Sequence, residues 1–309
     1  MLPANRLTSV FATDLAMIRA YGCERACVPT PKENALGWSS LLLMRGGRFV
    51  KETEGVQQLC DTTHAAFFNR GEAYRVWHPD ECGDAITEFV LHEDVLRDVV
   101  DRLDPSPRDL EERPFARREV RLGTRAFMTH HAIWRAAITG DAPALAIEEA
   151  IIAFVHGAVA RARDTATDRG ARSGPGQPQR RPATRRVRRE LAHEARLILT
   201  HEHRKPPDLS ALAETLGVSP FHFSRVFREE TGSSVHGFLV GVRLRRALAQ
   251  LGADGADLAQ IAHQSGFSDQ SHMTRHFRRA FGRPPSKLRG TRARELLAEV
   301  SKNVQDDSA

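Results

Sequence analysis

The chain has 309 residues, of which 41% are hydrophobic, and this size and composition are typical of about two packed domains. We expect no membrane helix, because no apolar run reaches the roughly 18 residues that one requires, and no secretory signal. The four cysteines all lie within the first 82 residues and are too few for a disulfide framework. These features exclude membrane and disulfide-rich secreted classes and predict a cytoplasmic protein without membrane partners.

Charge divides the chain into two halves. Residues 1–160 carry 18 Lys and Arg against 23 Asp and Glu, a net charge of −5. Residues 161–309 carry 27 basic and 16 acidic residues, a net charge of +11. Arginine supplies almost all the basic residues of the second half, and it suits bidentate contacts with phosphates and guanine. The distribution predicts that the second half binds nucleic acid or another anionic surface.

The first half is predicted to form strands and then helices. Short apolar segments, separated by Gly, Pro and Asn, predict strands at 36–50, 56–60, 65–69, 72–78 and 84–91. From Asp94 to about residue 162, apolar residues recur at helical spacing. Closely spaced strands are typical of an antiparallel sandwich or a small barrel, so we predict an α+β domain.

Evidence for chemistry in the first half is weak. The candidate metal ligands are His64, His78, His92, Cys82 and the pair Cys23 and Cys27. The His-x-His pattern of cupin enzymes does not accompany them, so we expect no metal, no other cofactor and no catalytic site. Aromatic residues on the expected strands, such as Trp38 and Tyr74, either form the core or line a small-molecule pocket. The adjacent His130 and His131 are interpreted as a surface or interface pair.

Residues 164–184 are rich in Gly, Pro, Ser and Arg and predict a flexible basic linker. The arginines of this linker are either simply solvated or add non-specific phosphate contacts. Beyond the linker, the chain to about residue 290 is predicted to be almost wholly helical.

Two segments of this helical region repeat each other. The run 222-HFSRVFREETG-232 matches 272-HMTRHFRRAFG-282 at a spacing of 50 residues. Three further matches lie upstream at a spacing of 49. In these, Ala213, Gly217 and Ser219 correspond to Ala262, Gly266 and Ser268, respectively. Each copy therefore contains a short helix, a turn with Gly and a second helix, which is the arrangement of a helix-turn-helix.

The chemistry of each turn supports this interpretation. Gly217 and Gly266 can adopt the left-handed conformation that ends the first helix of each copy. Ser219 and Ser268 can cap the second helix of each copy by accepting a hydrogen bond from a backbone N–H.

Periodicity divides each second helix into two faces. We expect the inward face to hold Phe223, Val226 and Phe227 in the first copy and Met273, His276 and Phe277 in the second. The candidate base-reading residues on the outward face are Phe221, Ser224, Arg225, Gln270, Ser271, His272 and Arg275. Gln suits adenine and Arg suits guanine in the major groove. The arginines that follow each reading face suit phosphates, and these are Arg228, Arg278 and Arg279.

At these residues the chain resembles the AraC/XylS family of bacterial transcription regulators. The similarity runs from Leu209 to Arg289 and includes the segments LSALAETLGVSPFHFSRVFREETG and IAHQSGFSDQSHMTRHFRRAFGRPP. The resemblance implies an all-α DNA-binding domain with two helix-turn-helix motifs, in which the same outward residues occupy the reading positions and Phe221 makes van der Waals contact. Two departures affect local packing only: Leu288 replaces a usual aromatic residue, and His236 stands where Pro is frequent.

The resemblance also implies a role for the first half. Members of the family often carry a cupin-like β-barrel that senses a signal, followed by dimerising helices, and residues 67–84 look like part of such a barrel. We therefore expect a sensing or dimerisation domain at 1–163, the linker at 164–184, the DNA-binding domain at 185–290 and a C-terminal tail at 291–309.

The resemblance implies four partners: double-stranded promoter DNA, RNA polymerase if the protein is an activator, a second copy of the chain and a small-molecule effector. It also implies a location at the bacterial nucleoid. Two alternatives remain open. The first half of a constitutive regulator would only dimerise, and an enzyme would use the basic half only to reach DNA.

Overall fold

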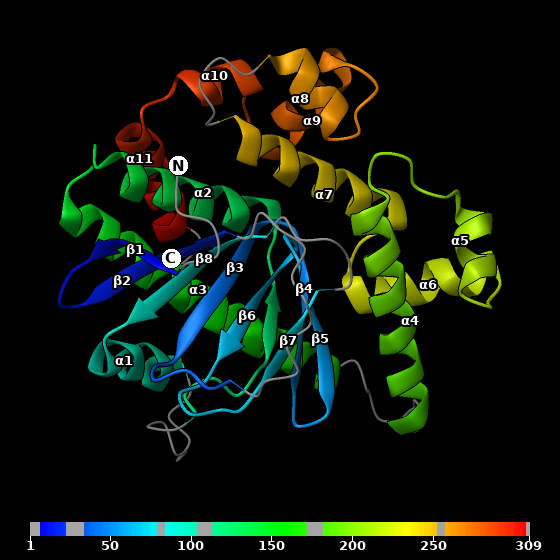
Figure 1. Cartoon of the computed structure of the whole chain (residues 1–309), viewed down its shortest axis with the longest axis horizontal. Coiled ribbons are helices and arrows are strands. Elements are labelled where there is room, and N and C mark those ends of the chain that lie inside the picture. Colours follow the sequence, from blue (N-terminus) through cyan, green and yellow to red (C-terminus); the bar gives the residue numbers. More distant parts are fainter. Residues whose placement is uncertain are drawn as a thin grey trace. The chain divides into compact units, whose positions relative to one another are not determined.

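The computed structural model describes residues 7–22, 34–78, 84–103, 113–171, 182–251 and 257–306. The chain divides into two compact units, drawn in Figure 1. Unit 1 comprises residues 1–167 together with 289–309, and unit 2 comprises residues 168–288. The chain therefore leaves unit 1, forms unit 2 and returns to unit 1. Within the described ranges, no helix is both long and apolar enough to cross a bilayer.

Unit 1 is built on two antiparallel sheets. Its strands are β1 (Thr8–Ala12), β2 (Ala16–Gly22), β3 (Ser40–Gly46), β4 (Phe49–Thr53), β5 (Val56–Cys60), β6 (His64–Phe68), β7 (Arg75–Trp77), β8 (Ala85–Leu91) and β9 (Glu119–Arg121). The first sheet has the order β1-β2-β8-β3-β6-β9 and the second has the order β5-β4-β7. The described strands thus form two open sheets, and the expected cupin-like barrel is not confirmed.

Strands β1, β2 and β9 were not predicted, and β9 lies in the region 94–162 that was expected to be helical, whereas the other strands of the first half were predicted. Strand β2 pairs along its whole length with β8, from Ala16 opposite Leu91 to Gly22 opposite Ala85. Such a strand is stabilised by a partner that lies far along the chain, so local patterning indicates it poorly. The single strand predicted at 36–50 is divided into β3 and β4 at Gly47, whose φ of 75° requires a residue that tolerates the left-handed region.

Four helices complete unit 1, namely α1 (Glu93–Leu103), α2 (Thr124–Thr139), α3 (Ala144–Ala171) and α11 (Ala293–Asp306). One face of the larger sheet packs on α2 and α3, because the ring of Phe89 on β8 lies 5.8 Å from that of His130 and 5.5 Å from that of Phe154. The other face meets the smaller sheet through a cluster of Met44, Phe49, Cys60, Ala66 and Phe68. The alternation of side chains along β6 and β8 supplies both faces.

The C-terminal segment is a helix where the sequence predicted a tail. Helix α11 packs on α2 within unit 1 and buries Ala293, Leu296, Leu297 and Val300. The expected linker is also partly helical, since α3 continues to Ala171 and the next helix begins at Pro182. Residues 172–181, the central part of the expected linker, lie outside the described residues.

His130 lies in the core of unit 1, with 1% of its surface exposed, and not at the surface as predicted. Its ring packs among those of Phe89, Phe127 and Phe154. Neither ring nitrogen has a hydrogen-bond partner among the described residues. Burial, followed by the nearby charge of Arg45, keeps the pKa of His130 well below its usual value. The imidazole is therefore neutral in the folded protein.

Replacing His130 by Leu is expected to make unit 1 less sensitive to acid. The unfolded chain binds a proton at this histidine below about pH 6.5, whereas the folded chain does not. Above that pH, His130 therefore does not make the free energy of unfolding depend on pH. Below it, the free energy of unfolding decreases as the pH falls, by up to about 1.4 kcal/mol per pH unit. Leu removes the titrating group and keeps a similar volume. Urea denaturation of the full chain between about pH 7 and pH 5 measures the slope, and equal slopes for the two proteins would contradict this account.

Of the candidate metal ligands, the structure describes only His64, His78 and His92. Cys23, Cys27 and Cys82 lie outside the described residues. Within the described ranges, no group of three His, Cys, Asp or Glu side chains is arranged to hold a metal ion. His78 instead pairs with Asp84, at 2.5 Å between Nε2 and Oδ2.

Unit 2 is all-helical. Its helices are α4 (Pro182–His201), α5 (Leu209–Thr215), α6 (Pro220–Thr231), α7 (Val235–Gln250), α8 (Leu258–Gln264), α9 (Gln270–Phe281) and α10 (Pro285–Gly290), the last of which ends beyond the unit. Helices α4, α5, α6 and α7 share one core, which includes Leu199, Leu212, Phe223, Phe227 and Phe238. Helix α7 also contacts α8 and α9, so it joins the two repeated segments.

Candidate nucleic-acid interface

The first repeated segment forms a helix-turn-helix from α5 and α6. Gly217 has a φ of 67°, the left-handed conformation predicted for the end of α5. The turn is closed by a hydrogen bond from the backbone N of Val218 to the carbonyl O of Ala213, at 3.0 Å. Ser219 is the N-cap of α6, and its Oγ accepts a hydrogen bond from the backbone N of His222 at 3.3 Å. These local interactions set the direction in which α6 leaves the turn.

The second segment forms the same motif from α8 and α9, but with a different cap. Asp269, not Ser268, is the N-cap of α9, and its carboxylate accepts a hydrogen bond from the backbone N of His272 at 2.7 Å. The turn of the second copy is one residue longer than that of the first. Asp269, not Ser268, therefore lies 50 residues after Ser219, in register with the repeated helices. The prediction of Ser268 as the cap overlooked this change of spacing.

The inward face of each second helix is largely as predicted. Phe223, Val226 and Phe227 in α6, and Met273 and Phe277 in α9, are fully buried. His276 is an exception, because it is only partly buried and does not occupy a core position like that of Val226. Helices α6 and α9 are therefore fixed to the rest of unit 2 mainly by aromatic packing.

The outward face carries the predicted reading and phosphate-binding side chains. Eight of them are exposed: Phe221, Arg225, Arg228, Gln270, Ser271, Arg275, Arg278 and Arg279. Ser224 and His272 are partly buried. Phe221 is 79% exposed, which is unusual for a large aromatic side chain and leaves its ring available for a partner.

Helices α6 and α9 differ in charge. Helix α6 holds Arg225 and Arg228 together with Glu229 and Glu230, so its arginines and glutamates balance. Helix α9 holds three arginines and no acidic residue. In addition, Glu229 pairs with Arg225 on its own helix, at 4.0 Å, and with Arg188 of α4. Helix α9 therefore offers the stronger attraction for a polyanion.

His272 is held within the protein by both of its ring nitrogens. Its Nδ1 lies 2.9 Å from the Oγ of Ser268, and its Nε2 lies 3.1 Å from Nε2 of His276. Partial burial, followed by the charge of His272, lowers the pKa of His276. The sequence prediction treated His276 only as a core residue, although two histidines four residues apart on a helix meet on one face.

The comparisons with known proteins concern this region. A family model described as a helix-turn-helix domain matches residues 212–291. The HTH-type transcriptional regulator GlxA of Rhizobium meliloti is 34% identical over 119 residues, which are 37% of this chain and 36% of GlxA. The multiple antibiotic resistance protein MarA of Escherichia coli is 30% identical over 86 residues, which are 28% of this chain and 68% of MarA.

The extent of these matches differs between relatives. The chain matches 36% of the length of GlxA and 31% of that of the regulatory protein Ada of Salmonella typhimurium. Among solved structures, an AraC-type transcriptional regulator from Chromobacterium violaceum is 26% identical, with a TM-score of 0.32, over 34% of this chain and 93% of that one.

Proposed function

Because the chain belongs to the AraC/XylS family of transcription regulators, we propose that it recognises promoter DNA by sequence through α6 and α9 and thereby regulates transcription. The observation that carries this proposal is the pair of helix-turn-helix motifs, each of which exposes polar and basic side chains at the start of its second helix. The N-terminal part of such a helix is the part that enters the major groove.

In this proposal the exposed residues have two roles. Residues at the starts of the helices read bases, and these are Phe221, Ser224, Arg225, Gln270, Ser271, His272 and Arg275. Arginines further along bind phosphates and set the register, and these are Arg228, Arg278 and Arg279. Two such helices suit successive major grooves on one side of the duplex, about 34 Å apart. His272 reads DNA only after it exchanges its hydrogen bonds with Ser268 and His276 for contacts with a base.

We assign the control of DNA binding to unit 1. A cavity formed by its described residues, about 420 Å³ in volume, is within the size range of small-molecule sites. A small molecule bound there acts if it has different affinities for the DNA-competent and DNA-incompetent states of the protein. The domain roles follow the expected division: sensing or dimerisation by residues 1–163, a linker at 164–184 and DNA binding by 185–290. A homodimer and RNA polymerase are the macromolecular partners in this proposal.

Selection of random duplex DNA by the purified full chain, followed by sequencing, tests the proposal. We expect a motif of two short blocks about one helical turn apart, because two recognition helices contribute. A repeat of the whole motif would support a dimer. Retention of DNA without any motif, abolished by moderate salt, would mean that only the phosphate backbone is recognised, and it would contradict the base-reading roles.

Arg275→Ala is expected to weaken binding to the selected site by about 1–3 kcal/mol and to relax specificity at one base pair. The matched control is Arg278→Ala on the same helix. It should weaken binding to all sequences about equally and reduce the dependence on salt, because a phosphate contact carries no sequence information. Binding titrations at several salt concentrations, on the selected site and its single-base variants, separate the two effects. If Arg275→Ala changed neither affinity nor base preference, α9 would not enter the groove as proposed.

A further inference from the structure

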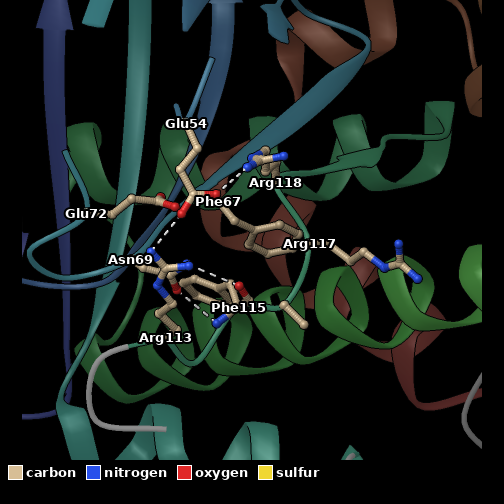
Figure 2. Close-up of a pocket in the computed structure, with 9 residues that line it drawn as sticks. Glu54, Phe67, Asn69, Glu72, Arg113, Phe115, Arg117 and Arg118 are labelled. Carbon is tan, nitrogen blue, oxygen red and sulfur yellow. Dashed lines mark hydrogen bonds and ion pairs between the residues drawn. The ribbon is translucent and has the colours of Figure 1, made fainter. Parts of the chain in front are cut away.

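The cavity of unit 1 lies at the edge of the sheets, where three segments meet. It is lined by Glu54 from the β4–β5 turn, by Phe67 from β6 and by residues of the segment that leads into β9, including Arg113, Phe115 and Arg118. Figure 2 shows Arg113 and Arg118 approaching the carboxylate of Glu54 from two sides. The cavity therefore combines two guanidinium groups directed to one point with a wall of two largely buried aromatic residues, Phe67 and Phe115, which are 2% and 5% exposed.

The arginine-bearing segment is held firmly against the sheet. The side chain of Asn69 bonds both the backbone N and the carbonyl O of Phe115, at 2.9 and 3.1 Å. The rings of Phe67 and Phe115 are stacked, with centroids 4.6 Å apart. The carbonyl O of Arg118 accepts a hydrogen bond from the backbone N of Phe67 at 2.9 Å. The two guanidinium groups are thus placed by a pre-formed backbone, which lowers the entropy lost on binding a ligand.

The carboxylate of Glu54 lies between the two guanidinium groups. One oxygen lies 2.9 Å from Nη2 of Arg113, and the other lies 2.7 Å from Nη2 of Arg118. The three side chains are 51%, 59% and 37% exposed, so a solute can reach them from water. An exposed ion pair of this kind contributes little to stability. A dissolved carboxylate or phosphate can therefore compete with Glu54 without unfolding the unit.

The backbone of Glu54 is in an unfavourable conformation for its residue type. Among the described residues, it is the non-glycine residue with a positive φ, at 52°, and Gly55 beside it has a φ of 72°. These two residues form the tight turn between Thr53 and Val56, which are paired on β4 and β5. Such a turn favours Asn or Gly at its first central position, and another residue there costs about 1–2 kcal/mol. Strain of this sort is concentrated at functional sites, and here it accompanies a carboxylate that lies between two arginines.

Charge favours an anionic ligand over a cationic one. Among the described residues, three arginines and two glutamates line the cavity, although Arg117 points away from the others in Figure 2. The second glutamate, Glu72, already faces the buried amine of Lys51, with 3.5 Å between Oε2 and Nζ. Both carboxylates are thus engaged by cations of the protein, and a cationic ligand would have to displace arginine or lysine from each.

We propose that this cavity binds a small organic anion, a carboxylate or phosphate with an apolar group, which replaces the Glu54 carboxylate between Arg113 and Arg118. The apolar group lies against the Phe67–Phe115 wall. Release of Glu54 frees the β4–β5 turn from its link to the segment that leads into β9. That the anion acts as an effector rests on the function proposed above, whereas its binding does not.

Binding is tested on the full chain by thermal shift and calorimetry with three probes: phenylacetate, inorganic phosphate and the neutral phenylacetamide. We expect a saturable stabilisation by phenylacetate, a weaker one by phosphate and none by phenylacetamide. Absence of binding by both anions at millimolar concentration, or equal binding of phenylacetate and its amide, would overturn the proposal.

Two variants sharpen the test. Glu54→Asn removes the competing carboxylate and suits the turn, so it should fold and should bind phenylacetate about tenfold more tightly. Arg113→Ala combined with Arg118→Ala should abolish the binding. The matched control is Arg70→Ala, which removes the exposed ion pair of Arg70 with Glu93 elsewhere in unit 1 and should leave anion binding unchanged. Weaker binding by the Glu54→Asn variant, or unchanged binding by the double arginine variant, would contradict the proposal that the anion replaces Glu54 between Arg113 and Arg118.

This experiment and the DNA selection fail independently. Loss of anion binding with an intact DNA motif would overturn this inference alone. Anion binding without any DNA motif would contradict the function proposed for unit 2 and leave the anion site in place.

Discussion

Gly266→Ala is expected to destabilise unit 2 by about 2–5 kcal/mol, because it combines backbone strain with a steric clash. Gly266 has a φ of 89° in the turn of the second helix-turn-helix. A Cβ at this position would lie 2.7 Å from the carbonyl O of His203 and 2.9 Å from Nε of Arg243. Those two atoms are hydrogen-bonded to each other at 2.8 Å, so neither moves without a further loss. Urea denaturation of the full chain measures the effect, and DNA affinity should decrease with it.

The equivalent glycine of the first copy provides the control. Gly217 also has a positive φ, of 67°, but no atom of the described residues outside its immediate chain neighbours lies within 4 Å of a Cβ added there. Gly217→Ala therefore introduces the backbone strain alone and should destabilise unit 2 by only about 1–2 kcal/mol. Equal effects of the two substitutions would mean that the second turn does not pack closely against the segment that follows α4.

Phe227→Ala is expected to destabilise unit 2 by about 3–5 kcal/mol, the range for an aromatic side chain removed from a packed core. Phe227 is fully buried, and its ring lies 5.6 Å from that of Phe223 and 5.4 Å from that of Phe238. The contact with Phe238 joins α6 to α7, so the substitution should lower DNA binding only through loss of folded protein. Chemical denaturation measures the stability, and binding titrations under strongly stabilising conditions measure the remaining affinity.

Phe221→Ala on the same helix should have the opposite pattern. Its ring is 79% exposed, so the substitution should leave the free energy of unfolding nearly unchanged and weaken DNA binding directly. The two variants remove the same side chain from opposite faces of α6. If Phe221→Ala reduced stability and left DNA affinity intact, the two faces of the helix would be wrongly assigned.

The sequence alone determined the two helix-turn-helix motifs and, apart from His276, the faces of their second helices. The reason is that their interactions are local: Gly217 and Gly266 end a helix, Ser219 begins one, and apolar residues recur every three or four positions. The one cap assigned wrongly, at Ser268, was a local error as well, because the shift from a spacing of 49 to one of 50 already pointed to Asp269.

Only the tertiary structure decided features that depend on residues far apart along the chain. Strand β2 exists because it pairs with β8, and α11 is a helix of unit 1 because α2 offers it an apolar surface. The burial of His130 likewise depends on rings from β8 and α3. Glu54 meets Arg113 across 59 residues, so the cavity could not be predicted from any single segment. These elements are stabilised by packing and pairing between segments far apart along the chain, which local residue patterns do not specify.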